Sequence, residues 1–474
     1  MNIRKKLFGD RAFYRMVLTV TVPIMIQNGI TNFVGLLDNI MVGRIGTEQM
    51  SGIAIVNQLL MVFNLAIFGA LSGVGIFGAQ FFGCRNHKGV QHTLRFKIYV
   101  GLGILVLGTV ILMAGGEQLI QMYLHGEGNE QALQATLGYG REYLWVMLAG
   151  LPPFVLEEIY ASTLREGGET KLPMIAGVVA VLVNLALNYV LIFGKLGFPE
   201  LGVVGAAIAT VISRYVQMAV VIAWTHRNPE KMPFIVGAYR EWKVPGQLSW
   251  NIVSKGTPLM LNEILWSAGL PLLFNELAWS AGMAMMTQCY STRGLDAVAA
   301  LNISTVISNL FNVVFVAMGS AVSIIVGQLL GAGKMEEAKD TDRKLIAFAV
   351  MSSVGAGAVV AMTAPLFPQL YNTSGEVKHL AAALLRVAAL CMPVFAFLHT
   401  TYFTLRSGGK TIITFLFDSV FLWCVSIPVA YVLSRHTTMA IAALYLSCQM
   451  LDLIKCVIGF VLVKKGVWLN NIVA

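Results

Sequence analysis

Charged residues are scarce in this sequence. Only 12% of its 474 residues are Asp, Glu, Lys or Arg, whereas soluble globular domains carry roughly 25%. Hydrophobic residues make up 57% of the chain and fall in one long run after another, from MVLTVTVPIMIQNGITNFVGLL to MAIAALYLSCQMLDLIKCVIGFVLV. A helix that crosses a bilayer needs about 20 mostly apolar residues. The composition therefore excludes a soluble domain and predicts an all-α membrane protein with many transmembrane helices.

Several other signals are missing, and each absence argues against a class of protein. Outer-membrane barrels have segments of about ten residues with alternating polarity, but the apolar runs here are continuous. The six cysteines form no CxxC pair and no disulfide pattern, so we expect free thiols. No HExxH, G-x-S-x-G or G-x-x-x-x-G-K-[ST] motif points to an enzyme or an ATP-driven pump. The net charge is +9, but the basic residues are dispersed over short loops, which argues against nucleic acid as a partner.

The apolar runs predict twelve spans, and the basic residues predict their orientation. The spans cover roughly residues 15 to 43, 50 to 80, 95 to 116, 138 to 162, 172 to 194, 203 to 225, 258 to 292, 297 to 330, 345 to 366, 380 to 404, 412 to 434 and 438 to 463. The termini and even-numbered loops hold 24 Lys and Arg, against five in the odd-numbered loops. Because positively charged loops stay in the cytoplasm, both termini are predicted to be cytoplasmic, in a cell (inner) membrane.

An internal repeat divides the chain into two related halves. Gln80-Phe-Phe-Gly83 recurs as Gln328-Leu-Leu-Gly331, 248 residues later. The pattern T-L-R-x-G-G-x-T, which starts at Thr163, recurs from Thr404 at an offset of 241 residues. Transporters often show such symmetry between their halves. We therefore predict a six-helix lobe at 1–225, a cytoplasmic linker at 226–257, and a second six-helix lobe at 258–474. The linker is expected to be an interfacial helix or a solvated connector.

A shorter tandem duplication opens the second half. PLMLNEILWSAGL at 258–270 is followed at once by PLLFNELAWSAGM at 271–283. Thirteen residues extend a helix by roughly 20 Å, so the two copies cannot lie at the same depth. The second copy starts at Pro271, which lies 248 residues after Pro23. This is the same offset as between the two halves, so the second copy is the one that belongs to the repeat. Glu276 is therefore the preferred candidate for a functional acid, and Glu263 is its duplicate.

Ionisable and amide side chains inside the predicted spans are candidate functional groups, because such groups are costly in a membrane. Asp38 has no basic residue within one helical turn, so it is either a coupling acid or a hydrogen-bond acceptor for a neighbouring helix. Asn184 and Asn188 share one helix face. Two amide oxygens beside a carboxylate suit Na⁺ or a protonatable carboxyl. Two amides that bridge neighbouring helices explain the same spacing equally well.

The second half carries its own acids, and none lies at the repeat position of Asp38. Glu276 is the preferred coupling or substrate residue among them. Asp452 has a simpler explanation, because Lys455 lies three residues later and can form an in-helix ion pair. Asp418 lies near a predicted cytoplasmic end, where water can solvate it.

These elements together resemble the multidrug and toxic compound extrusion (MATE) transporters. The likeness covers nearly the whole chain, and its motifs are specific in combination. They are P-x14-D-N-x-M-V-G-R-x-G from Pro23 to Gly46, G-x-Q-x-x-G from Gly78 to Gly83, LREGGETKLP, NLALNYVLIFG followed by GVVGAAIAT, PLLFNELAWSAG, VGQLLGAG and LRSGGKT. The duplication at 258–283 departs from the family pattern.

The resemblance implies twelve transmembrane helices in two pseudo-symmetric six-helix lobes around a central cavity. It also implies export of amphipathic, often cationic compounds in exchange for H⁺ or Na⁺, by a monomer embedded in membrane lipid, with no other cofactor. Asp38, Asn184 and Asn188 match the family's polar positions, Thr210 joins that cluster, and Glu276 or Glu263 is similar to the acid of its seventh helix. The alternative is a lipid-linked sugar flippase of the same superfamily, which commonly has fourteen spans and a basic cavity.

Overall fold

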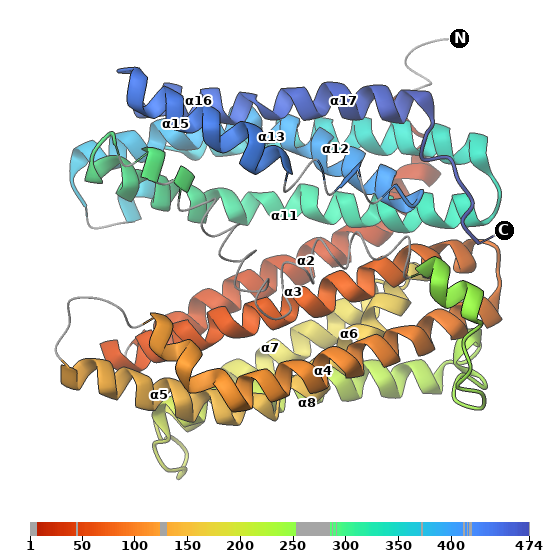
Figure 1. The fold of residues 1–474 in the computed structure, drawn as a ribbon, viewed down its shortest axis with the longest axis horizontal. Helices are drawn as coiled ribbons and strands as arrows, with labels where there is room; N and C mark the ends of the chain where they lie inside the picture. Colours follow the sequence, from red (N-terminus) through yellow and green to blue (C-terminus); the bar gives the residue numbers. More distant parts are fainter. Residues whose placement is uncertain are drawn as a thin grey trace. The chain divides into compact units, whose positions relative to one another are not determined.

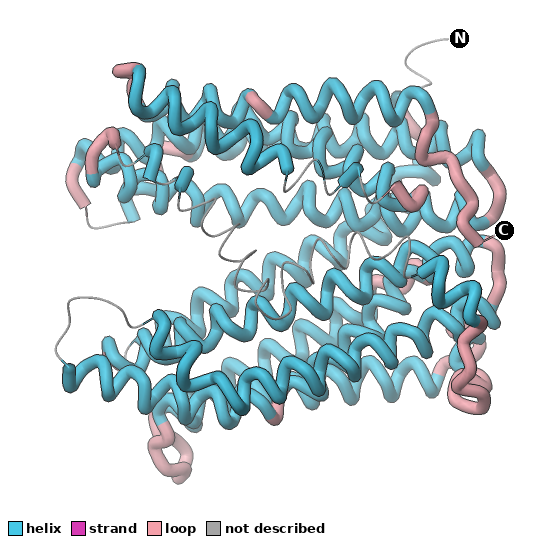
Figure 2. The backbone as a smooth tube through the Cα atoms, viewed as in Figure 1, coloured by secondary structure: helices cyan, strands magenta, loops and turns pink. Residues whose placement is uncertain are grey.

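The computed structural model is helical almost throughout. It describes residues 7–43, 46–123, 130–252, 285–286, 288–290, 292–370, 373–410, 413–414, 416 and 420–473. Figure 2 shows helices joined by short loops, and no strand occurs among these residues. The predicted all-α fold class is confirmed.

The long helices follow one another along the chain, and most of their connections are short (Figure 1). The elements are α2 (Arg11–Gly43), α3 (Thr47–Gly83), α4 (His87–Tyr123), α5 (Glu130–Leu148), α6 (Leu151–Glu166), α7 (Lys171–Ile192), α8 (Gly202–Arg227), η1 (Pro233–Ile235), α11 (Leu295–Gly331), α12 (Met335–Thr363), η2 (Phe367–Leu370), α13 (Gly375–Ser407), η4 (Leu422–Ser426), α15 (Ile427–His436), α16 (Ile441–Met450) and α17 (Asp452–Lys465). Most η elements are single 3-10 turns, whereas η4 is a π-helical turn.

Several of these helices are long and apolar enough to cross a membrane. Within the described residues there are eight, or nine when α5 and α6 count as one span with a 50° bend between them. The predicted seventh span, 258–292, lies mostly outside the described residues. The multi-pass membrane architecture is confirmed, and the count of twelve spans stays a prediction.

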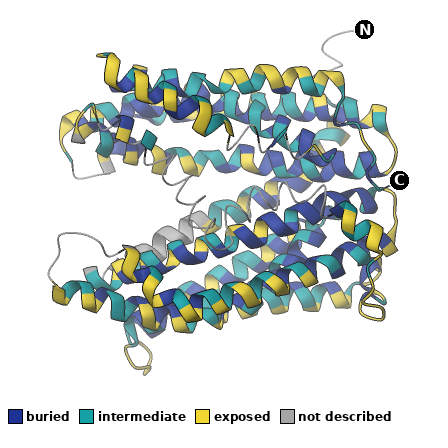
Figure 3. Cartoon of the chain, in the orientation of Figure 1, coloured by how far each residue is buried: buried dark blue, intermediate teal, exposed yellow. Residues whose placement is uncertain are grey.

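Apolar side chains line the exposed face of single helices, as expected where lipid rather than water is the solvent. Figure 3 shows exposed positions along α4. Large hydrophobic side chains are exposed there at short intervals, namely Leu102, Val106, Leu107, Val110 and Met113. A helix satisfies its own backbone hydrogen bonds, so a face of this kind is stable against hydrocarbon.

The chain packs into two compact units. Unit 1 contains Met1–Met25, Ala79–Arg85 and Ser254–Ala474, and unit 2 contains Ile26–Gly78 and Asn86–Val253. The chain passes from one unit to the other within α2 and within α3. The core of unit 1 includes one cluster in which α2 side chains such as Val17 and Val20 pack with α11 and α12.

Both copies of the T-L-R-x-G-G-x-T motif end a helix with the same turn. The Gly168 N–H donates to Arg165 O at 2.9 Å, and the Gly409 N–H donates to Arg406 O at 2.9 Å. Both glycines have positive φ, at 86° and 78°, a region that glycine adopts without steric cost. The repeat found in the sequence is therefore a repeat of local structure.

The Q-x-x-G motifs end α3 and α11 within unit 1, and each motif contacts the other. A Cβ atom added to Gly83 would overlap the Gln328 carbonyl, and one added to Gly331 would overlap the Gln80 carbonyl. The glycines thus allow the two backbones to approach closely. The Gln80 side chain is fully buried. It donates to Ser407 O at 3.0 Å and Asn470 O at 3.1 Å, and it accepts from the Ile472 N–H at 2.8 Å.

The described part of the linker folds onto unit 2. Between residues 228 and 245 the only helical element is the short turn η1. Three α4 side chains at four-residue spacing hold it. Gln91 donates to Val236 O at 2.8 Å, Arg95 donates to Ala238 O at 2.7 Å, and Tyr99 donates to Trp242 O at 2.7 Å. Residues 246–252 are helical.

Candidate functional site

The predicted polar residues of α7 and α8 form one chain of hydrogen bonds in unit 2, which is buried at the two asparagines and half-buried at the threonine. Asn188 Nδ2 donates to Asn184 Oδ1 at 3.0 Å, and Asn184 Nδ2 donates to Thr210 Oγ1 at 3.3 Å. The Thr210 hydroxyl in turn donates to Ala206 O at 3.1 Å. Asn184 is 5% exposed and Asn188 is 2% exposed. The structure therefore brings together three of the predicted site residues, from two helices that pack along their length.

This chain has the donor chemistry that a small cation or a proton carrier needs. Asn184, Asn188 and Thr210 each contribute a side-chain oxygen, and such hard ligands suit Na⁺. The same groups can hold a neighbouring carboxyl in either protonation state, because amides and hydroxyls both donate and accept hydrogen bonds. The two chemistries use the same atoms.

Of the remaining predicted acids, the structure describes the side chain of only one, Asp452. Asp38 lies on α2 within the part of unit 2 that starts at Ile26, but its side chain is outside what the structure describes. Glu263, Glu276 and Asp418 lie outside the described residues. Asp452 pairs with Lys455 at 2.6 Å, which confirms the in-helix ion pair expected for it.

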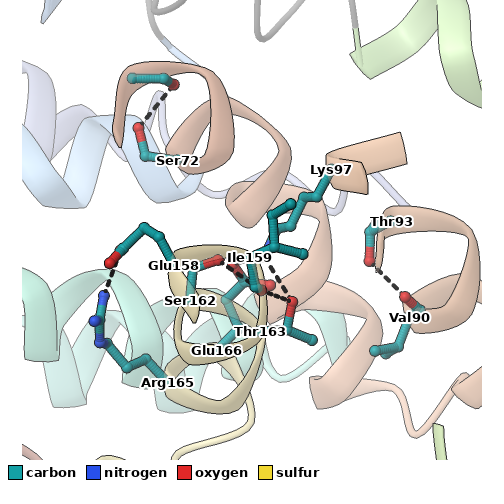
Figure 4. A network of polar contacts seen from close by, with 11 residues as sticks. Ser72, Val90, Thr93, Lys97, Glu158, Ile159, Ser162, Thr163, Arg165 and Glu166 are labelled. Carbon is teal, nitrogen blue, oxygen red and sulfur yellow. Dashed lines mark hydrogen bonds and ion pairs between the residues drawn. The ribbon is translucent and has the colours of Figure 1, made fainter. Parts of the chain in front are cut away.

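A second buried polar cluster in unit 2 joins α4 to the end of α6 (Figure 4). Lys97 Nζ donates to Glu166 Oε1 at 2.6 Å, to Thr163 Oγ1 at 3.0 Å and to Ser162 Oγ at 3.1 Å. The Lys97 side chain is 0% exposed and that of Glu166 is 10% exposed. Burying an ion pair is costly unless good geometry and further hydrogen bonds compensate it, and this pair has both.

The repeat places a different polar pair at the equivalent helix end of unit 1. The Thr404 hydroxyl donates to Asp342 Oδ1 at 2.5 Å, and Asp342 is buried. Thr404 is the repeat partner of Thr163, which accepts from Lys97. The threonine is common to both halves, while the charge of its partner is reversed.

Sequence reasoning passed over a third group of charges, which lies between α6 and α8. Arg214 of α8 donates to Gly150 O at 3.2 Å and lies over the Phe154 ring at 5.0 Å. Glu157 of α6 is buried and is hydrogen bonded to the Gln217 side chain of α8. The signal was present, because Glu157 falls inside the predicted span at 138 to 162 and Arg214 inside the one at 203 to 225.

Aromatic side chains and a histidine connect α6 and α8 to the docked linker. The Tyr160 hydroxyl lies 3.0 Å from His226 Nε2 and is hydrogen bonded to the Tyr239 hydroxyl. The His226 and Tyr239 rings stack at 5.9 Å with an interplanar angle of 14°. Tyr239 belongs to the loop outside the spans, and burial raises the pKa of its hydroxyl. It therefore acts here as a neutral hydrogen-bonding group.

Comparison with known proteins agrees with the repeat and with the fold. The MatE family model matches residues 23–190 and again residues 271–432. The probable multidrug resistance protein NorM of Thermotoga maritima is 23% identical over 422 residues, which are 89% of this chain and 85% of that one. The multidrug resistance protein MdtK of Yersinia pseudotuberculosis is 26% identical over 432 residues, 88% and 87% of the two chains.

Solved structures show the same fold. The crystal structure of the Vibrio cholerae MATE transporter VcmN in the bent form is similar with a TM-score of 0.82, at 17% identity, over 97% of both chains. The two matches of the family model together span well over half of the chain and fall on its two repeated halves. This protein is therefore a multi-pass membrane protein that belongs to the MatE family.

Proposed function

We propose that this protein is a secondary active antiporter that exports amphipathic, often cationic compounds in exchange for H⁺ or Na⁺. The observation that carries the proposal is the hydrogen-bonded chain of the buried Asn184 and Asn188 with the half-buried Thr210. It lies in a fold whose relatives are named multidrug resistance proteins. Buried polar groups in a membrane bundle are retained where they bind or move something.

In this proposal, Asp38 on α2 binds the coupling ion and the α7 and α8 oxygens help to hold it. Ion binding disfavours the substrate-bound state, and the site alternates between the two sides of the membrane. Coupling of this kind requires that the ion and the substrate each have different affinities for the two states. Both termini face the cytoplasm, as the distribution of Lys and Arg favours.

The test is efflux of a fluorescent organic cation from proteoliposomes, driven in turn by an imposed H⁺ or Na⁺ gradient. Wild-type protein should transport under one of the two gradients. Asp38→Asn and Asn188→Ala should each slow transport by about 5- to 150-fold, the range of ordinary coupling free energies. Asn302→Ala is the matched control, because Asn302 is exposed on α11.

Two outcomes would contradict the proposal. If the wild type moves no cation under either gradient, lipid flipping or another cargo becomes the better explanation. If Asp38→Asn transports against a gradient as well as the wild type does, the coupling role of Asp38 is lost.

A further inference from the structure

A row of polar side chains runs along one face of α8, toward α7 at its start and toward α6 further on. Thr210, Arg214 and Gln217 are spaced four and three residues apart, so they lie on one helix face. Each contacts a different neighbour, namely Asn184 of α7, the Gly150 carbonyl and Glu157 of α6. The row thus begins at the proposed coupling cluster and ends at a buried acid.

Glu157 differs from Glu166, the other buried acid of unit 2, because it forms no direct ion pair among the described residues. It is 4% exposed, and within the part of the chain that the structure describes its Oε1 has no hydrogen-bond partner. The groups that act on it are Glu158 and Arg165 of its own helix and Arg214 and Gln217 of α8. On α4, the buried Lys97 is already paired with Glu166.

Such an environment makes Glu157 suited to binding and releasing a proton. A buried carboxylate with an unsatisfied oxygen is costly. Charged groups act on it from two helices, Glu158 and Arg165 from α6 and Arg214 from α8. Arg214 is bonded to Gly150, in the break where α5 and α6 bend by 50°. A change in that bend would therefore change the charge that Glu157 experiences.

Two further side chains, Tyr160 of α6 and His226 of α8, lead from the neighbourhood of Glu157 to the exposed end of α8. Tyr160 lies three residues after Glu157 on the same face of α6, about 4.5 Å further along the helix. Its hydroxyl is hydrogen bonded to His226 Nε2, and the His226 side chain is exposed at the end of α8. A hydroxyl and an imidazole can pass a proton along, directly or through one water.

We propose that Glu157 is a proton-binding group of the transport cycle and that Tyr160 and His226 connect it to the cytoplasmic solvent. This inference rests on the proposed antiport and names H⁺ as the coupling ion. In the step toward the cytoplasm, the Glu157 O–H bond breaks, Tyr160 accepts that proton and gives its own to His226 Nε2, and the imidazolium releases it to water. No other reactant takes part.

The test uses full-length protein in proteoliposomes with the fluorescent cation as substrate and a pH-sensitive dye to follow H⁺. Glu157→Gln should slow H⁺-driven efflux by about 5- to 150-fold and flatten its dependence on pH. The purified variant should still bind the cation, but its affinity should no longer depend on pH in the way the wild type's does, because binding of H⁺ and of the cation are coupled reciprocally. Glu157→Asp, which keeps an ionisable carboxyl, should restore pH-dependent transport in part. Glu117→Gln is the matched control, because that carboxyl is on the surface of α4 and pairs only loosely with Arg141 at 3.8 Å.

Tyr160→Phe and His226→Phe keep the proposal testable if Glu157→Gln fails to fold. Both should slow H⁺-driven efflux while leaving cation binding intact. The inference is overturned if Glu157→Gln, or both aromatic variants, transport with the wild-type rate and pH profile, or if only a Na⁺ gradient drives the wild type. These outcomes contradict only the role of Glu157 and leave the proposed antiport function in place. The antiport function is contradicted by a different result, namely that the wild type transports under neither gradient.

Discussion

Replacing Lys97 with methionine should destabilise the protein strongly. The Lys97 side chain is fully buried and donates to three oxygens, with the shortest contact, 2.6 Å, to Glu166. Methionine fills a similar volume but leaves the Glu166 carboxylate buried without its cation. Removing one partner of a buried ion pair costs about 3 to 5 kcal/mol, more than the pair itself contributes relative to an apolar substitute. We expect a loss of that size in the free energy of unfolding.

Little space is available for Glu166 to escape this penalty. A Cβ atom at Gly75 would lie 2.6 Å from its Oε1, and one at Gly78 would overlap Oε2. The carboxylate is therefore enclosed by α3 on that side, and it cannot turn toward water without moving the helix. The double variant Lys97→Met, Glu166→Gln removes the orphaned charge and should recover roughly 2 kcal/mol, within the usual range of pairwise coupling energies.

The assay is equilibrium unfolding of the purified protein in mixed micelles by added SDS, followed by far-ultraviolet circular dichroism. Arg141→Met is the control, because Arg141 and Glu117 form an exposed pair and such pairs contribute about 0 to 1 kcal/mol. The reasoning is refuted if Lys97→Met unfolds at the same SDS fraction as Arg141→Met. The single variant Glu166→Gln is measured as well. The reasoning is also refuted if the losses of the two single variants simply add in the double variant, because the two side chains would then not be coupled.

Two further changes probe the contacts of α3 with α11 and of α4 with the linker. Gly331→Ala should cost about 3 kcal/mol in the SDS assay, the upper end for overpacking, because its Cβ meets the Gln80 backbone and not a side chain that can turn away. Gly355→Ala, on an exposed face of α12 with nothing near its Cβ, should instead be neutral or stabilising. Arg95→Met removes the bonds to Ala238 O and Gly237 O and should speed tryptic cleavage after the exposed Arg240 without changing global unfolding. Equal cleavage of Arg95→Met and wild type would show that Arg95 does not hold the linker.

The fold class and the α7–α8 cluster could be predicted because their signals are local. Continuous apolar runs specify membrane helices wherever those helices pack, since the bilayer satisfies no backbone hydrogen bond. Asn184 and Asn188 are four residues apart, so helix geometry alone places them on one face. Thr210 came from the family resemblance, and its contact with Asn184 depends on how α7 packs against α8.

The linker and the buried ion pair could not be predicted in the same way. Side chains more than 130 residues earlier hold residues 228–245 in place, and Arg95 is one of them. The local sequence of the linker therefore does not specify how the segment docks. Lys97 lies 69 residues before Glu166, so nothing in the local sequence pairs them. Glu157 is a different case. It lies inside a predicted span, and the cost of an intramembrane charge applies to it as it does to Asp38.

The two halves share a scaffold, but α6 and α13 differ in their buried charges, and this difference supports the role proposed for Glu157. The glycine turns after Arg165 and Arg406 are the same in both halves, which indicates that the repeat preserves how these helices end. At the same offset of 241, the partner of Glu157 is Leu398 and that of Glu166 is Ser407. A carboxyl that served only to pack α6 would be expected wherever the scaffold is repeated, but at both positions α13 packs with an uncharged side chain instead. The ion pair with Lys97 explains the burial of Glu166. Glu157 has no such partner among the described residues, so the proposed proton-binding role is the better explanation for keeping its carboxyl buried.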